Sequence, residues 1–329
     1  MSPLRRAWSL VPAALVGIGL VACQAPENGI GQGPTSGGSS GSDGTPSSTG
    51  VLASEGNGDS GLDDTQGVEA PPPPAKSYFI AESMDFTGNG CENDDVNEVT
   101  ASLQSVLADD GWAGTRVTEG QTRPLDFIDV NKRPFGKDDT KSDAASLAVY
   151  AGHGLIDKIG WGTQDDTPTV EPTEKRCVAT PSKDVRLGSM AGGWAKSVAL
   201  LTSCTGSLSC YESSLATSDA TQVFAFNNSP KIWNNAARRF YRKSEDMPNR
   251  DAWIAAMDNR PGLGKNSPVV YTRGTSEEQV LQIHQSARLA EIDQIPSEQA
   301  TTWYAYTWVD HGLHGSCAPD LENCSGVDD

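Results

Sequence analysis

The chain has 329 residues, with 25 Lys and Arg against 43 Asp and Glu, which gives a formal net charge of -18 at pH 7. This acidic balance argues against nucleic-acid binding, because phosphate backbones are bound mainly by clustered Lys and Arg. Hydrophobic residues make up only 36% of the sequence, but the shortage is concentrated in one stretch, and the remainder has the composition of an ordinary globular domain.

The first 22 residues have the features of an export signal. Arg5 and Arg6 form a positive region, and the apolar run from Ala7 to Ala22 is shorter than the ~20 residues that a membrane-spanning helix requires. The run ends in Leu20-Val21-Ala22-Cys23, which resembles the bacterial lipobox. This resemblance implies cleavage before Cys23, a diacylglycerol on its thiol and a fatty acyl group such as palmitate on its amine. The alternative is an ordinary signal peptide, in which Cys23 is incidental.

Residues 23–75 are predicted to be the lipidated cysteine followed by a disordered tether. Of the 52 residues from Gln24 to Ala75, 27 are Gly, Ser or Pro, seven are acidic, and none is Lys, Arg or aromatic. Such a segment cannot bury enough apolar surface to fold. Because Gln24 rather than Asp follows the cysteine, we expect an anchor in the outer membrane or at the cell surface.

Residues 76–309 are predicted to form one α/β domain, and residues 310–329 a cysteine-containing tail. Short apolar runs, typical of strands, alternate with longer segments in which apolar residues recur at helical spacing. This alternation favours a mostly parallel sheet with helices on both faces. The predicted strands are 78–81, 112–118, 147–150, 198–201, 223–226, 269–271 and, at the sheet edge, 301–309, and the predicted helices are 94–107, 231–242, 250–257 and 276–291.

Two of the predicted strands are followed by residues that carry chemistry. The strand 147–150 leads into Ala151-Gly152-His153-Gly154, and the strand 198–201 leads into Thr202-Ser203-Cys204. Loops at the carboxyl ends of parallel strands form ligand-binding crevices, so neighbouring strands would bring His153 to Cys204. An imidazole can take the proton of a thiol and stabilise the reactive thiolate. The pattern therefore indicates a nucleophile and its base.

At these residues the chain resembles the caspase-like cysteine peptidases, the clan of caspases, gingipains, legumains and clostripain. Their shared pattern is an apolar strand that ends in His-Gly and a later apolar strand that ends in a small residue and the catalytic Cys. Both halves are present here, at His153-Gly154 and at Ser203-Cys204, and the resemblance covers roughly residues 77–290. It implies His153 as the general base, Cys204 as the nucleophile and the Gly154 N–H as an oxyanion donor.

The resemblance does not identify a specificity pocket, and the cleavage preference stays open. Arg176, Arg186 and Lys196, between the two motifs, are compatible with a pocket for acidic side chains and equally with an exposed surface. Ser203 stands where the clan usually has Ala.

The cysteine count leaves a second interpretation open. With Cys23 lipidated, six cysteines remain, an even number that can pair completely in an oxidising compartment. Cys204 lies six residues before Cys210, and a disulfide between them would leave no nucleophile. The other pairings that the sequence suggests are Cys317 with Cys324, and Cys91 with Cys177 or Cys210.

The acidic loop at residues 92–95 contains the residue types that bind calcium, an ion that activates several members of the clan. Its carboxylates and carbonyls can ligate a hard cation, but the loop lacks the twelve-residue pattern of an EF-hand. The preferred interpretation is that Asp94 or Asp95 caps the helix predicted to follow. The proposed chemistry requires no cofactor.

The remaining histidines carry weaker signals. His311 and His314, near Cys317 and Cys324, have the residue types of a zinc site, but an exported cysteine pair is more often a disulfide, and no metal site is assigned. His284 lies in the middle of the last predicted helix among polar residues and is expected to be solvated.

The sequence therefore predicts a lipid-anchored bacterial protein whose α/β domain hydrolyses a peptide or protein substrate through an acyl-enzyme. The competing hypothesis is a catalytically inactive caspase-like module that binds a partner or has a structural role at the surface. The redox state of Cys204 and its distance from His153 distinguish the two hypotheses.

Overall fold

The computed structural model describes residues 17–22, 76–87, 96–155, 158–162, 177–188, 194–202, 205, 219–258, 266–296 and 303–309. The predicted tether and tail lie outside these described residues. So do six of the seven cysteines: Cys23, Cys91, Cys204, Cys210, Cys317 and Cys324.

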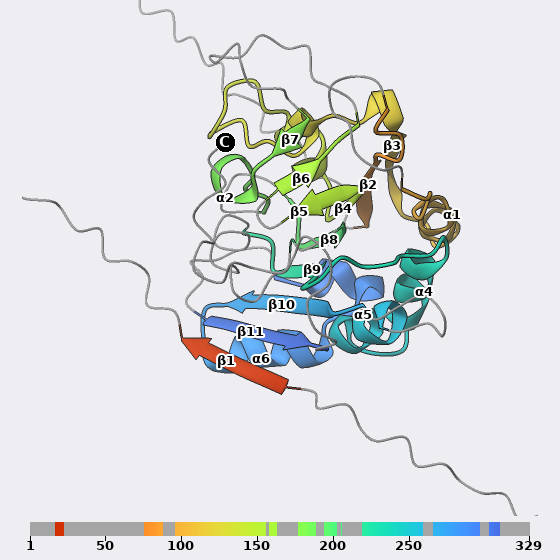
Figure 1. Ribbon diagram of the computed structural model, residues 1–329. Coiled ribbons are helices and arrows are strands. Elements are labelled where there is room, and N and C mark those ends of the chain that lie inside the picture. The colour runs from red at the N-terminus through yellow and green to blue at the C-terminus, as the bar shows by residue number, and fades with distance from the viewer. Residues whose placement is uncertain are drawn as a thin grey trace, which may run out of the picture. The chain divides into compact units, whose positions relative to one another are not determined.

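An eight-stranded sheet forms the centre of the domain (Figure 1). Its strands are β1 (Gly17–Ala22), β2 (Ser77–Glu82), β3 (Ala113–Thr118), β4 (Leu147–Ala151), β8 (Ser197–Leu201), β9 (Gln222–Phe226), β10 (Pro268–Gly274) and β11 (Trp303–Trp308). They lie in the order β1-β11-β10-β9-β8-β4-β2-β3. The four pairs from β3 to β9 are parallel, and the three pairs from β9 to β1 are antiparallel. The predicted α/β class with a mostly parallel sheet is confirmed.

The edge of the sheet differs from the sequence expectation. The expected edge strand β11 is covered by β1, which comes from the apolar run of the predicted signal and pairs antiparallel with β11 over six residues (Figure 1). An uncovered edge strand leaves its N–H and C=O groups unpaired, and an extended apolar segment satisfies them. In a chain cleaved before Cys23, β11 would be the edge strand.

The four longer helices are those that the sequence pattern predicts, with different bounds. They are α1 (Ala101–Asp109), α4 (Ala236–Lys243), α5 (Asn249–Met257) and α6 (Glu277–Ser286). The single turn α2 (Pro181–Asp184) and several 3-10 helices, including η6 (Leu289–Gln294), are additional. The helix predicted over 276–291 ends at Ser286 because Ala287 takes an extended conformation, with φ -60° and ψ 138°. None of the described helices has both the length and the apolar composition needed to cross a membrane.

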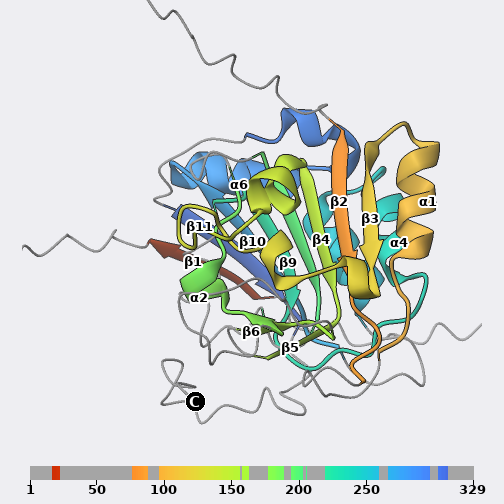
Figure 2. The ribbon, with the colours of Figure 1, turned by 90° about the horizontal axis from the view of Figure 1, so that it is seen from above.

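The two faces of the sheet are covered by different kinds of element (Figures 1 and 2). The four longest helices pack on one face, where the fully buried Trp253 lies among Phe224, Phe226 and Phe240. The other face carries the single turn α2, the 3-10 helix η2 (Pro124–Asp126) and a small sheet of β5 (His153–Leu155), β6 (Lys158–Gly160) and β7 (Val178–Ala179). Both faces are therefore covered, but the longer described helices share one of them.

The position of His284 corrects the sequence expectation of a solvated side chain. His284 is 1% exposed on the face of α6 that packs against β10 and β11. Its Nδ1 lies 2.8 Å from the Thr272 hydroxyl and its Nε2 lies 2.8 Å from the Thr307 hydroxyl. Burial lowers the pKa of His284 to about 4. Two threonines from neighbouring strands satisfy the ring, and these partners were not visible in the helix sequence.

Asp143 is a buried carboxyl at the end of the sheet opposite the carboxyl ends of β4 and β8. It lies in the 3-10 helix η4 (Ser142–Ala144), and its Oδ1 accepts the N–H groups of Gly188 at 2.8 Å and Ala195 at 3.0 Å. Burial raises the pKa of Asp143 from 3.8 to about 8. The folded protein therefore holds this proton more tightly than the unfolded chain does. The resulting stability is fully present below about pH 4 and is lost as the pH rises toward 8.

Asp143→Asn removes this ionisation while keeping an oxygen acceptor for both amides. We expect the free energy of unfolding of the variant to exceed that of the wild type by an amount that grows between about pH 4 and about pH 8. The growth is at most about 1.4 kcal/mol per pH unit. Urea unfolding across this pH range measures it, and the exposed Asp139→Asn is the matched control. Parallel pH profiles for Asp143→Asn and the wild type would show that burial does not hold the proton on Asp143.

Candidate active site

The connections of the sheet diverge between β2 and β4. The chain passes from β2 to β3 on one side of this pair, whereas it passes from β4 to β8 on the other side. Such a switch point leaves a crevice at the carboxyl ends of the strands, where ligands bind in open α/β sheets.

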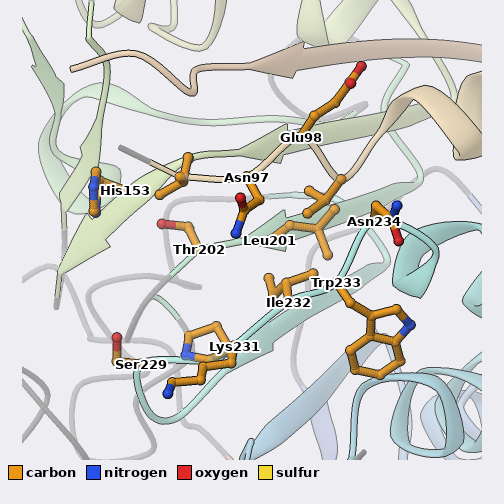
Figure 3. A pocket seen from close by; sticks show the side chains of 14 residues that line it. Asn97, Glu98, His153, Leu201, Thr202, Ser229, Lys231, Ile232, Trp233 and Asn234 are labelled. Carbon is orange, nitrogen blue, oxygen red and sulfur yellow. The ribbon is translucent and has the colours of Figure 1, made fainter. Parts of the chain in front are cut away.

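A cavity of about 760 Å³ lies at this edge (Figure 3). Its walls come from four segments: residues 96–99 after β2, residues 152–153 after β4, residues 201–202 at the end of β8, and residues 229–234 after β9. The volume falls within the range of small-molecule pockets. Four neighbouring parallel strands, β2, β4, β8 and β9, therefore contribute to one site. The sequence pattern predicted a common site for two of them, β4 and β8.

His153 lines the cavity and belongs to the first residues after β4. Ala151 is paired with Leu201 across β4 and β8, and the Gly152 N–H donates to the Leu201 carbonyl at 3.4 Å. The segments that leave these two strands are therefore adjacent. Cys204, three residues beyond Leu201, lies outside the described residues, so its separation from His153 stays a prediction.

The two glycines beside His153 have different surroundings. A Cβ atom at Gly152 would overlap the Tyr150 hydroxyl, so glycine is required there for the close approach of this side chain. Gly154, the predicted oxyanion donor, is buried in β5 opposite Ile159.

Tyr150 attaches the strand that carries His153 to the small sheet. Its side chain is fully buried, and its hydroxyl donates to the Gly160 carbonyl on β6. Burial raises the pKa of Tyr150 well above its usual value of 10.0, so the hydroxyl stays protonated as a donor. Since Gly160 is paired with His153 in the hairpin, this bond fixes the hairpin relative to β4.

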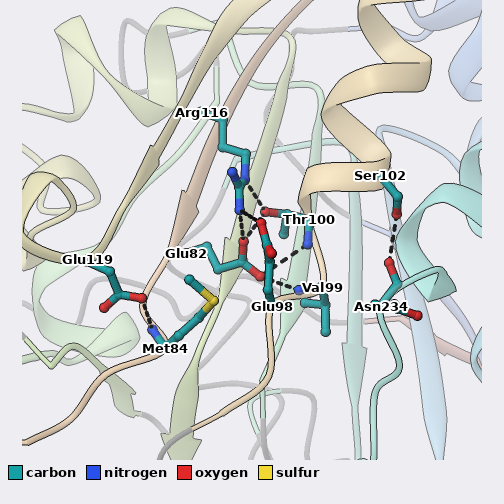
Figure 4. Close-up of polar contacts among 9 residues, drawn as sticks. All are labelled: Glu82, Met84, Glu98, Val99, Thr100, Ser102, Arg116, Glu119 and Asn234. Atoms are coloured by element: carbon teal, nitrogen blue, oxygen red, sulfur yellow. Dashed lines mark hydrogen bonds and ion pairs between the residues drawn. The ribbon is translucent and has the colours of Figure 1, made fainter.

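A buried carboxylate holds the opposite wall of the cavity (Figure 4). Glu82, the last residue of β2, is 0% exposed and accepts the N–H groups of Val99 at 2.5 Å and Thr100 at 3.1 Å. It also accepts the Thr100 hydroxyl at 2.5 Å and pairs with the Arg116 guanidinium at 2.6 Å. These bonds to the backbone explain why α1 begins only at Ala101 rather than at the predicted residue 94.

Sequence reasoning missed Glu82. The only signal was an acidic residue at the end of the otherwise apolar run Tyr78-Phe79-Ile80-Ala81. A charge at the end of a central strand is costly to bury without partners, and it therefore points to a polar site.

The charged residues on the cavity wall differ in their pairing. Glu98 forms an ion pair with Arg116 at 2.7 Å, whereas among the described residues the Lys231 ammonium forms none. Two of the basic residues that the sequence offered for a specificity pocket, Arg186 and Lys196, do not line the cavity. Arg186 pairs with Asp219 at 2.8 Å, Lys196 donates to the Asp293 carbonyl at 3.0 Å, and Arg176 is outside the described residues.

The threonines on either side of Cys204 carry unusual hydroxyl groups. Thr202 and Thr205 are 2% and 1% exposed, and neither hydroxyl has a hydrogen-bond partner in the part of the chain that the structure describes. Buried polar groups are normally paired, so such a group on a cavity wall is suited to a hydrogen bond with a ligand. Thr202 lines the cavity (Figure 3).

The two segments with residue types that could bind a metal, residues 92–95 and the histidines of the tail, lie outside the described residues. Within the described ranges, no three His, Cys, Asp or Glu side chains gather closely enough to hold a metal ion.

Comparison with known proteins assigns no family to the chain. No protein-family model matches it, and neither a curated protein nor a solved structure does. The mostly parallel α/β sheet is compatible with a caspase-like fold.

Thr202→Val tests whether the Thr202 hydroxyl lacks a partner in the folded chain. The substitution keeps the branched shape and removes a buried group that no described residue satisfies. We expect the free energy of unfolding to rise by about 1 kcal/mol.

The matched control is Thr221→Val, whose hydroxyl donates to the Pro296 carbonyl. Its loss should lower the free energy of unfolding by about 1 kcal/mol. Urea unfolding of both variants makes the comparison. Equal losses in the two would mean that the Thr202 hydroxyl is already bonded and is not available to a ligand.

Proposed function

We propose that this domain is a cysteine peptidase of the caspase-like kind, with Cys204 as nucleophile and His153 as base. The observation that carries the proposal is the shared cavity at the carboxyl ends of β4 and β8. His153 lines it from one strand, and Thr202, two residues before Cys204, lines it from the next strand. Adjacent parallel strands give their following residues one common edge, which is the arrangement that a nucleophile and its base require.

The proposed reaction proceeds through an acyl-enzyme. His153 takes the proton of the Cys204 thiol, and the thiolate attacks the carbonyl carbon of a peptide bond. The N–H groups of Gly154 and Cys204 are the proposed donors to the resulting oxyanion. The imidazolium then protonates the leaving amine, and water hydrolyses the thioester with the imidazole again acting as base. The proposed substrate is a peptide or a protein.

We also propose that the domain works at the outside of a bacterial membrane. The support comes from the sequence, in which the lipobox-like segment at Cys23 follows a charged and then an apolar region. A flexible chain of the tether's length extends on the order of 40 Å on average. The domain would thus reach substrates beyond the immediate lipid surface.

The cysteine pairing that fits this proposal joins Cys91 to Cys177 and leaves Cys204 reduced. Cys177 lies near the loop that follows β2, because its carbonyl accepts the Trp161 N–H at 2.6 Å and the neighbouring Gly162 packs against the backbone of Asp85 in that loop. Cys91 follows Asp85 by six residues in the sequence. The second candidate function, an inactive binding or structural module, is favoured by one observation, the six-residue spacing of Cys204 and Cys210.

Alkylation without reductant, followed by peptide mapping, distinguishes the two functions. For the peptidase we expect Cys204 to be modified faster than the other cysteines at pH 7. We expect His153→Gln to slow that reaction by roughly one order of magnitude, because the thiol would return toward its ordinary pKa of about 8.5. His311→Gln, in the predicted tail, is the control and should leave the rate unchanged.

Recovery of Cys204 in a disulfide with Cys210 would overturn the peptidase proposal in favour of the inactive module. Equal alkylation rates in the wild type and His153→Gln would show that His153 does not activate the thiol. A peptide-library digest, read by mass spectrometry, would then establish whether the reactive protein cleaves peptide bonds.

A further inference from the structure

Glu119 is held in an unfavourable backbone conformation. It begins the 3-10 helix η1 (Glu119–Gln121) and, among the described residues, it alone combines a side chain with a positive φ, which is 49°. The left-handed conformation is unfavourable for a residue with a Cβ, because the Cβ comes too close to the following carbonyl oxygen. Strain of this kind persists where the surrounding structure requires it, and it is concentrated at functional sites.

The strained backbone directs the Glu119 carboxylate at the loop that follows β2. One oxygen, Oε1, accepts the Met84 N–H at 3.1 Å, and the other, Oε2, accepts the Asp85 N–H at 3.0 Å. Figure 4 shows the first of these bonds. Two consecutive amides bonded to one carboxylate fix both the position and the orientation of this loop.

The same loop is held from its other side by the segment after β6. The Gly162 N–H donates to the Ser83 hydroxyl at 2.8 Å. A Cβ atom at Gly162 would overlap the Asp85 carbonyl, so the two backbones are in direct contact. A loop held on both sides has little freedom to move. Because Phe86 directly follows Asp85, any shift of Asp85 also moves Phe86.

Phe86 contacts the His153 imidazole. Its side chain is 2% exposed, the two ring centroids are 4.5 Å apart, and the rings meet edge to face at 74°. Such aromatic contacts have a preferred geometry and restrict the rotation of both rings. The imidazole is thus oriented by a residue whose own position depends on Glu119.

We propose that Glu119 is a positioning residue for His153 and acts through Phe86. The relevance of this role to catalysis rests on the proposed peptidase function, but the geometric claim does not. The backbone strain at Glu119 is then explained as the cost of aiming a carboxylate at the loop that orients the base.

The test uses the full chain, with His153 itself as the reporter. Glu119→Gly removes the carboxylate and suits a positive φ, so the relief of strain offsets the lost hydrogen bonds. Glu119→Gln keeps one oxygen acceptor and serves as the conservative variant. Phe86→Leu removes the ring and defines the signal of a His153 without its aromatic neighbour.

Selective isotope labelling of the four histidines gives few NMR signals, and His153→Gln assigns the one of interest. We expect the His153 ring resonances to shift in Glu119→Gly in the same direction as in Phe86→Leu, and less in Glu119→Gln. The His284 resonances are the internal control and should not move, because Thr272 and Thr307 hold that ring. If Glu119→Gly does not fold, Glu119→Asn, which also tolerates a left-handed backbone, takes its place.

The outcomes separate this inference from the proposed function. Unchanged His153 resonances in the folded Glu119 variants, or in Phe86→Leu, would overturn the positioning role, whatever the reactivity of Cys204. Shifted resonances together with an unreactive Cys204 would support the positioning role and reject the peptidase. Shifted resonances together with slower alkylation of Cys204 in Glu119→Gly would support both.

Discussion

The cavity keeps its shape above all because of one buried charge, the carboxylate of Glu82. A carboxylate without solvent must be matched by donors, and Glu82 is matched by an arginine, a hydroxyl and two backbone amides. These donors come from β3 and from the start of α1, so one side chain at the end of β2 fixes two further elements. The wall at residues 96–99 is ordered as a consequence, and α1 begins where the carboxylate allows it to begin.

The wall that carries His153 is built in a different way, from close packing rather than from charge. Gly152 leaves space for the Tyr150 side chain, whose neutral hydroxyl reaches the hairpin of β5 and β6. Phe86 packs against the imidazole from the loop after β2. Both walls are therefore contacted by residues at or just after the carboxyl end of β2, beside the switch point of the sheet.

The sequence predicted well the features that depend on local pattern. Continuous apolar runs such as 147–150 and 198–201 form strands because a sheet covered on both faces buries every residue of a strand. His284 was misjudged because its partners, Thr272 and Thr307, lie on strands that only the fold brings to the helix. Glu82 and Glu119 were missed for the same reason, since each acts on backbone amides that are 17 to 35 residues away in the chain.

The sequence by itself determined the α/β class and the positions of most strands, including the two neighbouring strands that precede His153 and Thr202. These features follow from apolar periodicity and from the rule that parallel strands end at a common edge. The tertiary structure alone decided which face the long helices cover, which glycine is sterically required, and which carboxylate holds the cavity wall at residues 96–99. Such features arise from contacts between distant segments, and the pattern of residues within one segment does not specify its partner.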